Sequence, residues 1–107
     1  MTANLFIRHD IITKIGGFDE RFDKPHFRED TDLAWRAQDY GQIPFADDVR
    51  VYHPPLLRNS KGESSDERDR FFVNDALLFS KHPQKYINLM RAEGHYAKDK
   101  NFWRYFK

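Results

Sequence analysis

The stretch Arg28-Glu29-Asp30-Thr31-Asp32-Leu33-Ala34-Trp35-Arg36 decides how this sequence is interpreted. Its first half places three carboxylates within four residues. Acidic side chains are favoured in the first turn of a helix, where the backbone N–H groups lack partners. Apolar residues then recur at helical spacing, at Leu33, Ala37 and Tyr40. The pattern predicts a helix over residues 30–40, with Gly41 as its C-terminal cap.

The rest of the first half alternates between strand-like and helical segments. Short apolar runs rich in β-branched or aromatic residues predict strands. The segments with this pattern are residues 3–8, 43–45 and 49–53. A short helix is predicted over residues 11–15, with Asp10 as its cap, Gly16 or Gly17 at its end and Phe18 in the core beyond it. This alternation predicts an α/β fold with a few short strands and flanking helices.

The second half of the chain is predicted to be a charged loop followed by helices. Residues 58–70 combine serine, glycine and both charges, which predicts a mobile charged loop. A helix is predicted from Ser64 or Ser65 to about Lys81, overlapping the end of that loop, and another from Pro83 to about residue 92. The expected organisation is therefore a domain over residues 1–57, the loop, and a helical C-terminal extension over residues 71–107.

Composition excludes several classes of function. Lys plus Arg number 18 against 17 for Asp plus Glu, so the basic excess of a nucleic-acid-binding protein is missing. The chain has no cysteine, which excludes disulfides and thiolate metal sites. It has no apolar run near the about 20 residues of a membrane span and no signal-peptide pattern, which predicts a cytoplasmic location. Residues 98–107 interleave aromatic and basic residues, which predicts packing on the helices or contact with the inner face of the membrane.

Three motifs in order carry a resemblance to a known family. They are Gly16-Gly17-Phe18-Asp19, the Glu29-Asp30 pair at the helix start, and Val49-Arg50-Val51-Tyr52-His53-Pro54. Together they resemble the C-terminal half of the family 2 glycosyltransferases, over residues 2–55. The resemblance implies a partial GT-A-like domain and the acceptor side of an inverting sugar transfer, from a nucleotide-sugar donor to a hydroxyl acceptor. The family's nucleotide-binding half has no counterpart in these residues, so whether the chain alone is an enzyme stays open.

The resemblance also implies roles for the acidic residues. It makes Asp30, with Glu29 beside it, the general base that takes a proton from the acceptor hydroxyl. The residues that it places at the acceptor are Gly16, Gly17, Asp19 and Asp32. The residues themselves leave structural alternatives open. The glycines can end a helix, Asp19 can cap a turn, and Asp32 can pair with Arg36 at i+4.

A donor site is implied as well. By resemblance, His53 is a ligand of a divalent metal, Mn²⁺ or Mg²⁺, which one histidine cannot hold alone. The resemblance would place Arg58 and Lys61 near the donor phosphates, but a solvated charged loop is the simpler interpretation of these two residues. The expected partners are a nucleotide-sugar donor and a glycan or lipid-linked acceptor in a complete enzyme. Neither the sugar nor the acceptor is defined by the sequence.

A second function, from another class, fits the same residues. The chain could be a non-catalytic interaction or oligomerisation module that keeps the fold without donor binding. An open sheet edge and uncovered aromatic surface would then favour a homo-oligomer or a partner chain.

Overall fold

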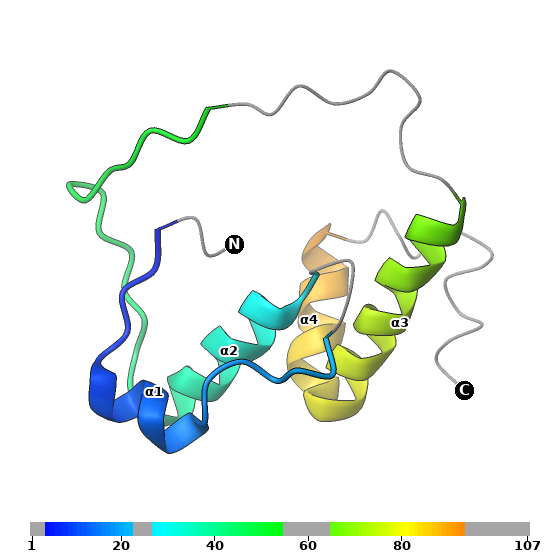
Figure 1. The fold of residues 1–107 in the computed structure, drawn as a ribbon, viewed down its shortest axis with the longest axis horizontal. Helices are drawn as coiled ribbons and strands as arrows, with labels where there is room; N and C mark the ends of the chain where they lie inside the picture. Colours follow the sequence, from blue (N-terminus) through cyan, green and yellow to red (C-terminus); the bar gives the residue numbers. More distant parts are fainter. Residues whose placement is uncertain (1–3, 23–26, 55–64, 94–107) are drawn as a thin grey trace. The chain divides into compact units, whose positions relative to one another are not determined.

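The regular structure of this chain is helical (Figure 1). The computed structural model describes residues 4–22, 27–54 and 65–93. The elements in these ranges are α1 (His9–Ile15), α2 (Glu29–Ala37), the 3₁₀ helix η1 (Gln38–Tyr40), α3 (Ser65–Lys81) and α4 (Pro83–Glu93). The chain divides into two compact units. Unit 1 comprises Met1–Arg21 and Glu29–Ser60, and unit 2 comprises Phe22–Arg28 and Lys61–Lys107.

The predicted α/β fold is wrong, because the described residues contain helices and no strand. The described parts of the three predicted strands are neither helical nor paired in a ladder. β-Branched and aromatic side chains favour a strand, but a strand also needs a neighbour to exchange backbone hydrogen bonds. No segment among the described residues is such a neighbour to these three. The side-chain pattern of these segments is therefore not enough to produce the predicted sheet.

Helix α1 begins after an extended Arg8 and ends at a left-handed glycine. Gly16 has φ 78°, and its N–H donates to the carbonyl of Ile12 at 3.1 Å, which confirms the predicted end of the helix. The predicted cap is wrong, because the helix already begins at His9 and Asp10 lies in its first turn. There the Asp10 carboxylate accepts a hydrogen bond from the Arg8 guanidinium at 3.1 Å.

Helix α2 confirms the helix predicted from the stretch of residues 28–36, but the predicted last turn is a 3₁₀ helix. Leu33 and Ala37 are buried, as the predicted apolar stripe requires. The α-helix stops at Ala37 and continues as η1, so Tyr40 does not complete the stripe and is exposed. A 3₁₀ turn has about 3.0 residues instead of 3.6, which rotates Tyr40 away from the buried face. Helix α1 packs against α2 within unit 1.

Helices α3 and α4 pack against each other in unit 2. Their observed bounds confirm the two predicted helices, and residues 65–70 of the predicted loop are helical. Only His82 separates the helices: its N–H donates to the carbonyl of Leu78 and its carbonyl accepts from the N–H of Tyr86, both at 2.9 Å. Pro83 follows at the first position of α4, where a missing N–H does no harm. The buried residues Phe72, Leu78 and Tyr86 form the core of this unit.

A buried ion pair fastens residues 27–28 to α3 in the same unit. Nε of Arg28 lies 2.9 Å from Oδ1 of Asp75, and the two side chains are 12% and 0% exposed. The side-chain amide of Asn74 donates to the carbonyl of Phe27 at 3.1 Å. These bonds hold Arg28 at φ 70°, a conformation that non-glycine residues rarely adopt. Burial, and then the nearby Asp75 carboxylate, raise the pKa of Tyr86 far above its ordinary value.

Candidate functional site

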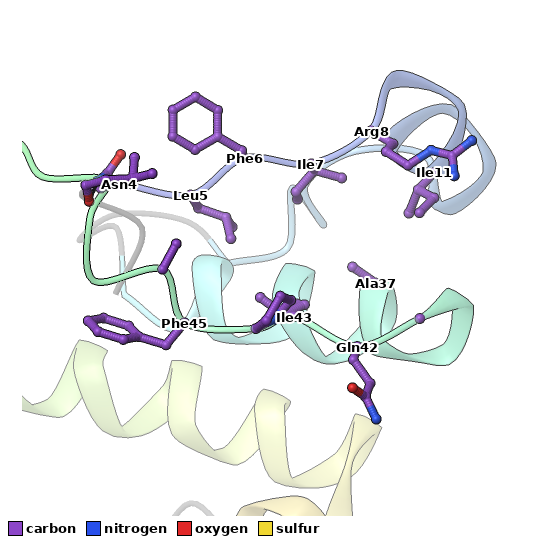
Figure 2. A pocket seen from close by; sticks show the side chains of 14 residues that line it. Asn4, Leu5, Phe6, Ile7, Arg8, Ile11, Ala37, Gln42, Ile43 and Phe45 are labelled. Atoms are coloured by element: carbon purple, nitrogen blue, oxygen red, sulfur yellow. Dashed lines mark hydrogen bonds between the residues drawn. The ribbon is translucent and has the colours of Figure 1, made fainter.

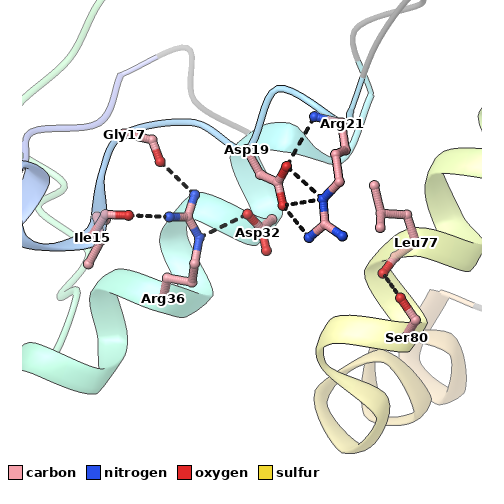
Figure 3. A network of polar contacts seen from close by, with 8 residues as sticks. All are labelled: Ile15, Gly17, Asp19, Arg21, Asp32, Arg36, Leu77 and Ser80. Carbon is pink, nitrogen blue, oxygen red and sulfur yellow. Dashed lines mark hydrogen bonds and ion pairs between the residues drawn. The ribbon is translucent and has the colours of Figure 1, made fainter.

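A polar network centred on Arg36 joins the motifs that the sequence singled out (Figure 3). The guanidinium of Arg36 donates from Nε to Oδ2 of Asp32 at 2.9 Å. It also donates to the backbone carbonyls of Ile15 at 2.7 Å and Gly17 at 2.6 Å. One side chain thus uses all three of its nitrogens to bind the glycine turn to α2, within unit 1.

Asp32 takes the structural role that the sequence left open for it. Its side chain is fully buried, and its ion pair with Arg36 is the predicted i+4 contact. A buried carboxylate is stable in the charged form only when cations and hydrogen bonds compensate its lost hydration. In this conformation solvent does not reach Asp32, so its predicted contact with an acceptor finds no support in the geometry.

Asp30 and Glu29 lie together in the first turn of α2, as predicted. Oδ1 of Asp30 accepts a hydrogen bond from the backbone N–H of Thr31 at 2.7 Å, and both carboxylate side chains are half-buried. One oxygen of Glu29, Oε2, is buried without a hydrogen-bond partner. The general-base role of these two residues stays a prediction. The contact with Thr31 is a local one, from the N–H of the next residue in the first turn of α2, where acidic side chains are favoured.

Asp19 holds the turn that follows the two glycines. Its Oδ1 accepts from the backbone N–H of Arg21 at 3.0 Å, and its Oδ2 lies 2.7 Å from Nη2 of the same residue (Figure 3). The hydrogen bond and the charge of Asp19 raise the pKa of Arg21. This geometry is that of the turn cap that the sequence allowed as an alternative. Phe18, predicted to be in the core, is half-exposed, since it lies in a turn and on no buried helix face.

The proposed donor residues are only partly within the described structure. His53 lies in the segment of residues 49–54 and is exposed. Among the described residues no three His, Cys, Asp or Glu side chains come close enough together to hold a metal ion. Arg58 and Lys61 lie outside the described residues, as does the 98–107 tail. The metal and phosphate roles therefore stay predictions from the sequence.

Unit 1 also contains a cavity of about 550 Å³ that sequence reasoning did not predict (Figure 2). It is lined by residues 4–8, Ile11, Ala37, residues 41–46 and Val49. Leu5 and Ile7 point toward the segment that carries Ile43, whereas Phe6 points the other way (Figure 2). The amide of Asn4 donates to the carbonyl of Val49 at 3.0 Å and links the two segments. The sequence signal for the cavity is the pair of apolar runs at residues 4–8 and 41–46. The cavity could have been predicted from them only by placing the two runs opposite each other without backbone pairing.

Several large apolar side chains on these two segments face solvent. Phe45 is 93% exposed, Tyr52 is 87% exposed and Phe6 is 80% exposed. Ile43, Val49 and Val51 are exposed as well. We call these six residues the open apolar surface. Scattered apolar residues are ordinary on a protein surface, but these six lie on two segments that a hydrogen bond links.

The fold and this surface define a small helical chain of two units, and comparison with known proteins assigns it to no family. No protein-family model, curated protein or solved structure matches the chain. The resemblance to the family 2 glycosyltransferases is therefore corrected on two grounds. No family model supports it, and the described residues have helices where a GT-A fold requires a sheet. The expected metal-dependent GT-A domain is withdrawn with it.

None of the helices in the described ranges is both long and apolar enough to cross a bilayer.

Proposed function

We propose that this chain is a non-catalytic oligomerisation module that associates with a second copy of itself through the open apolar surface. The observation that carries the proposal is the exposure of Phe6, Phe45 and Tyr52 on the linked segments of unit 1. Aromatic side chains are the residues that contribute most to protein interfaces when they become buried.

The size of the open apolar surface fits such an association. With about 200 Å² for a fully exposed aromatic side chain, its six residues expose roughly 700–800 Å² in total, of which about 160 Å² belongs to Phe6, which points away from the segment that carries Ile43. A standard protein interface buries about 800 Å² on each partner. The net charge of the chain is only +1, so two copies repel each other weakly. A second copy is thus a partner of suitable area and charge.

The polar network supports a non-catalytic role. The carboxylate of Asp32 accepts from the guanidinium of Arg36, and that of Asp19 accepts from the backbone N–H and the guanidinium of Arg21, all within unit 1. Asp30 accepts a bond from the backbone of its own helix. These contacts account for the conspicuous acidic residues as supports for the turn and the helix start. The sugar transfer inferred from the sequence, and a cytoplasmic location, stay predictions without support from the geometry.

Light scattering over a wide range of protein concentration tests the proposal. The expected result is a molar mass that rises from one chain to two as concentration increases. Phe45→Ser should move this transition to at least tenfold higher concentration, because truncating an aromatic interface residue in each of the two copies weakens the dimer by about 2 kcal/mol or more. Circular dichroism should show unchanged helix content, since Phe45 contributes almost no buried area to the isolated chain.

Phe18→Ser is the matched control. Phe18 is also an exposed phenylalanine of unit 1, but it lies in the turn after the glycines, outside the open apolar surface. This variant should associate like the parent chain. A parent chain that stays strictly monomeric at every concentration would contradict the proposed function. Equal weakening by both substitutions would show that the surface is not the interface.

A further inference from the structure

Residues 49–54 form an exposed segment in which the backbone of residues 50–53 is open to a partner. The residues are all exposed, and none belongs to a helix, turn or ladder. At its start, the N–H of Val49 donates to the carbonyl of Ala46 at 3.3 Å and its carbonyl accepts from Asn4. For residues 50–53, the described structure contains no backbone hydrogen bond. Exposed N–H and C=O groups in such a row are a template for pairing with another strand.

The side chains of this segment favour a strand once a neighbour is present. Val49, Val51 and Tyr52 are of the β-branched and aromatic types that pack well on a pleated surface. Pro54 ends the possible ladder, because it has no N–H to donate. A turn at residues 47–48 limits it at the other end. The segment that can pair is therefore residues 49–53.

We propose that two copies of the chain pair through antiparallel strands over residues 49–53, with the two-fold axis at Val51. This inference rests on the proposed function and specifies where and how the copies meet. In an antiparallel pair, directly opposed side chains point to the same face of the sheet. A two-fold axis perpendicular to that sheet must then pass midway between the two copies of one residue, which faces itself across the pair. The candidates for this residue are few.

Charge and proline select Val51 among these candidates. An axis at Arg50 would set the two Arg50 side chains directly opposite each other, and opposed like charges are destabilising. An axis at Tyr52 would bring Pro54 into the ladder opposite Arg50, where a hydrogen bond would be lost. An axis at Val51 avoids both, and it sets Arg50 opposite the aromatic ring of Tyr52 in the other copy, a favourable pairing of a cation with a ring.

Single cysteines test this register, because the chain has no cysteine of its own. Val51→Cys places two thiols on the axis, where opposed Cα atoms lie about 4.5–5.5 Å apart, within the range that a disulfide spans. Copper phenanthroline in air supplies the oxidant: Cu(II) takes the two electrons as the S–S bond forms and passes them to dioxygen, which is reduced together with the two thiol protons. The expected product is a dimer on a non-reducing gel that dithiothreitol converts back to monomer.

Val49→Cys is the control within the same segment. Val49 and Val51 are similarly exposed, at 45% and 56%. In the proposed register, however, the two Val49 residues lie four positions apart along the strands, about 14 Å at 3.4 Å per residue. Val49→Cys alone should therefore stay monomeric under the same oxidation. Mixed with His53→Cys, it should form a heterodimer, because Val49 faces His53 of the other copy.

The outcomes separate the two proposals. If the parent chain does not associate in light scattering, the proposed function itself fails. If the parent and the reduced cysteine variants associate but Val49→Cys cross-links as fast as Val51→Cys, the register is wrong. If Val51→Cys is folded but no longer associates, the mixture of Val49→Cys and His53→Cys tests the register in its place. Absence of a cross-link between these two variants overturns the inference.

Discussion

Replacement of Arg36 by methionine should destabilise unit 1 by about 3–5 kcal/mol, the usual effect of removing one partner of a buried ion pair. Asp32 is fully buried, so its charge would lose the guanidinium that lies 2.9 Å away without gaining water in exchange. The carbonyls of Ile15 and Gly17 would lose donors at 2.7 and 2.6 Å. Methionine keeps the apolar stem and a high helix propensity, so the change is confined to the charged group. Against a total stability of about 5–15 kcal/mol for a domain, this loss is large.

Urea unfolding followed by circular dichroism at neutral pH measures the loss. Arg8→Met is the control, because Arg8 and Asp10 also form an arginine–aspartate pair at 3.1 Å, with side chains 78% and 50% exposed. Exposed pairs contribute at most about 1 kcal/mol. Adding Asp32→Asn to Arg36→Met removes the buried charge and should restore part of the lost stability. If Arg36→Met and Arg8→Met lowered the free energy of unfolding equally, the interpretation of Arg36 as the support of the glycine turn would be refuted.

Two further predictions concern unit 2 and the donor site. Burial and the Asp75 carboxylate raise the pKa of Tyr86 above its ordinary value near 10, so above that pH the unfolded chain releases the phenol proton while the folded chain retains it. The contribution of Tyr86 to stability should therefore be constant below pH 10 and fall above it, by up to about 1.4 kcal/mol per pH unit, and Tyr86→Phe should remove this part of the fall in urea titrations. A non-catalytic module should give no heat in calorimetry with UDP and Mn²⁺ at millimolar concentration; heat that disappears in His53→Ala would instead favour the sugar-transfer interpretation.

The helices were predictable because their signals are local. The carboxylates at residues 29–32, the apolar spacing of Leu33 and Ala37, and the left-handed Gly16 act within one or two turns of the backbone. Proline at the first position of α4 acts in the same local way. Helix bounds follow from such contacts, so the sequence was enough to place them within a few residues.

The fold class was not predictable, because a sheet depends on pairing between distant segments. Residues 49–53 have the side chains of a strand, and the described structure gives them no strand to pair with. Of the bonds that Arg36 makes, the sequence predicted only the i+4 contact with Asp32. The bonds of Arg36 to the carbonyls of Ile15 and Gly17 span 21 and 19 residues, a distance at which side-chain periodicity carries no information. The same limit applies to Arg28 and Asp75, 47 residues apart.

The Arg36 network also has a consequence for how unit 1 folds. Helix α1 has seven residues and helix α2 has nine, and both are shorter than the about 12–15 residues that an isolated helix needs to persist in water. Arg36 on α2 donates to the carbonyl of Ile15 at the end of α1 and to the carbonyl of Gly17 just beyond it, so each helix holds the other in place. The amide protons of the two helices should therefore become protected from hydrogen exchange together, and not one helix after the other.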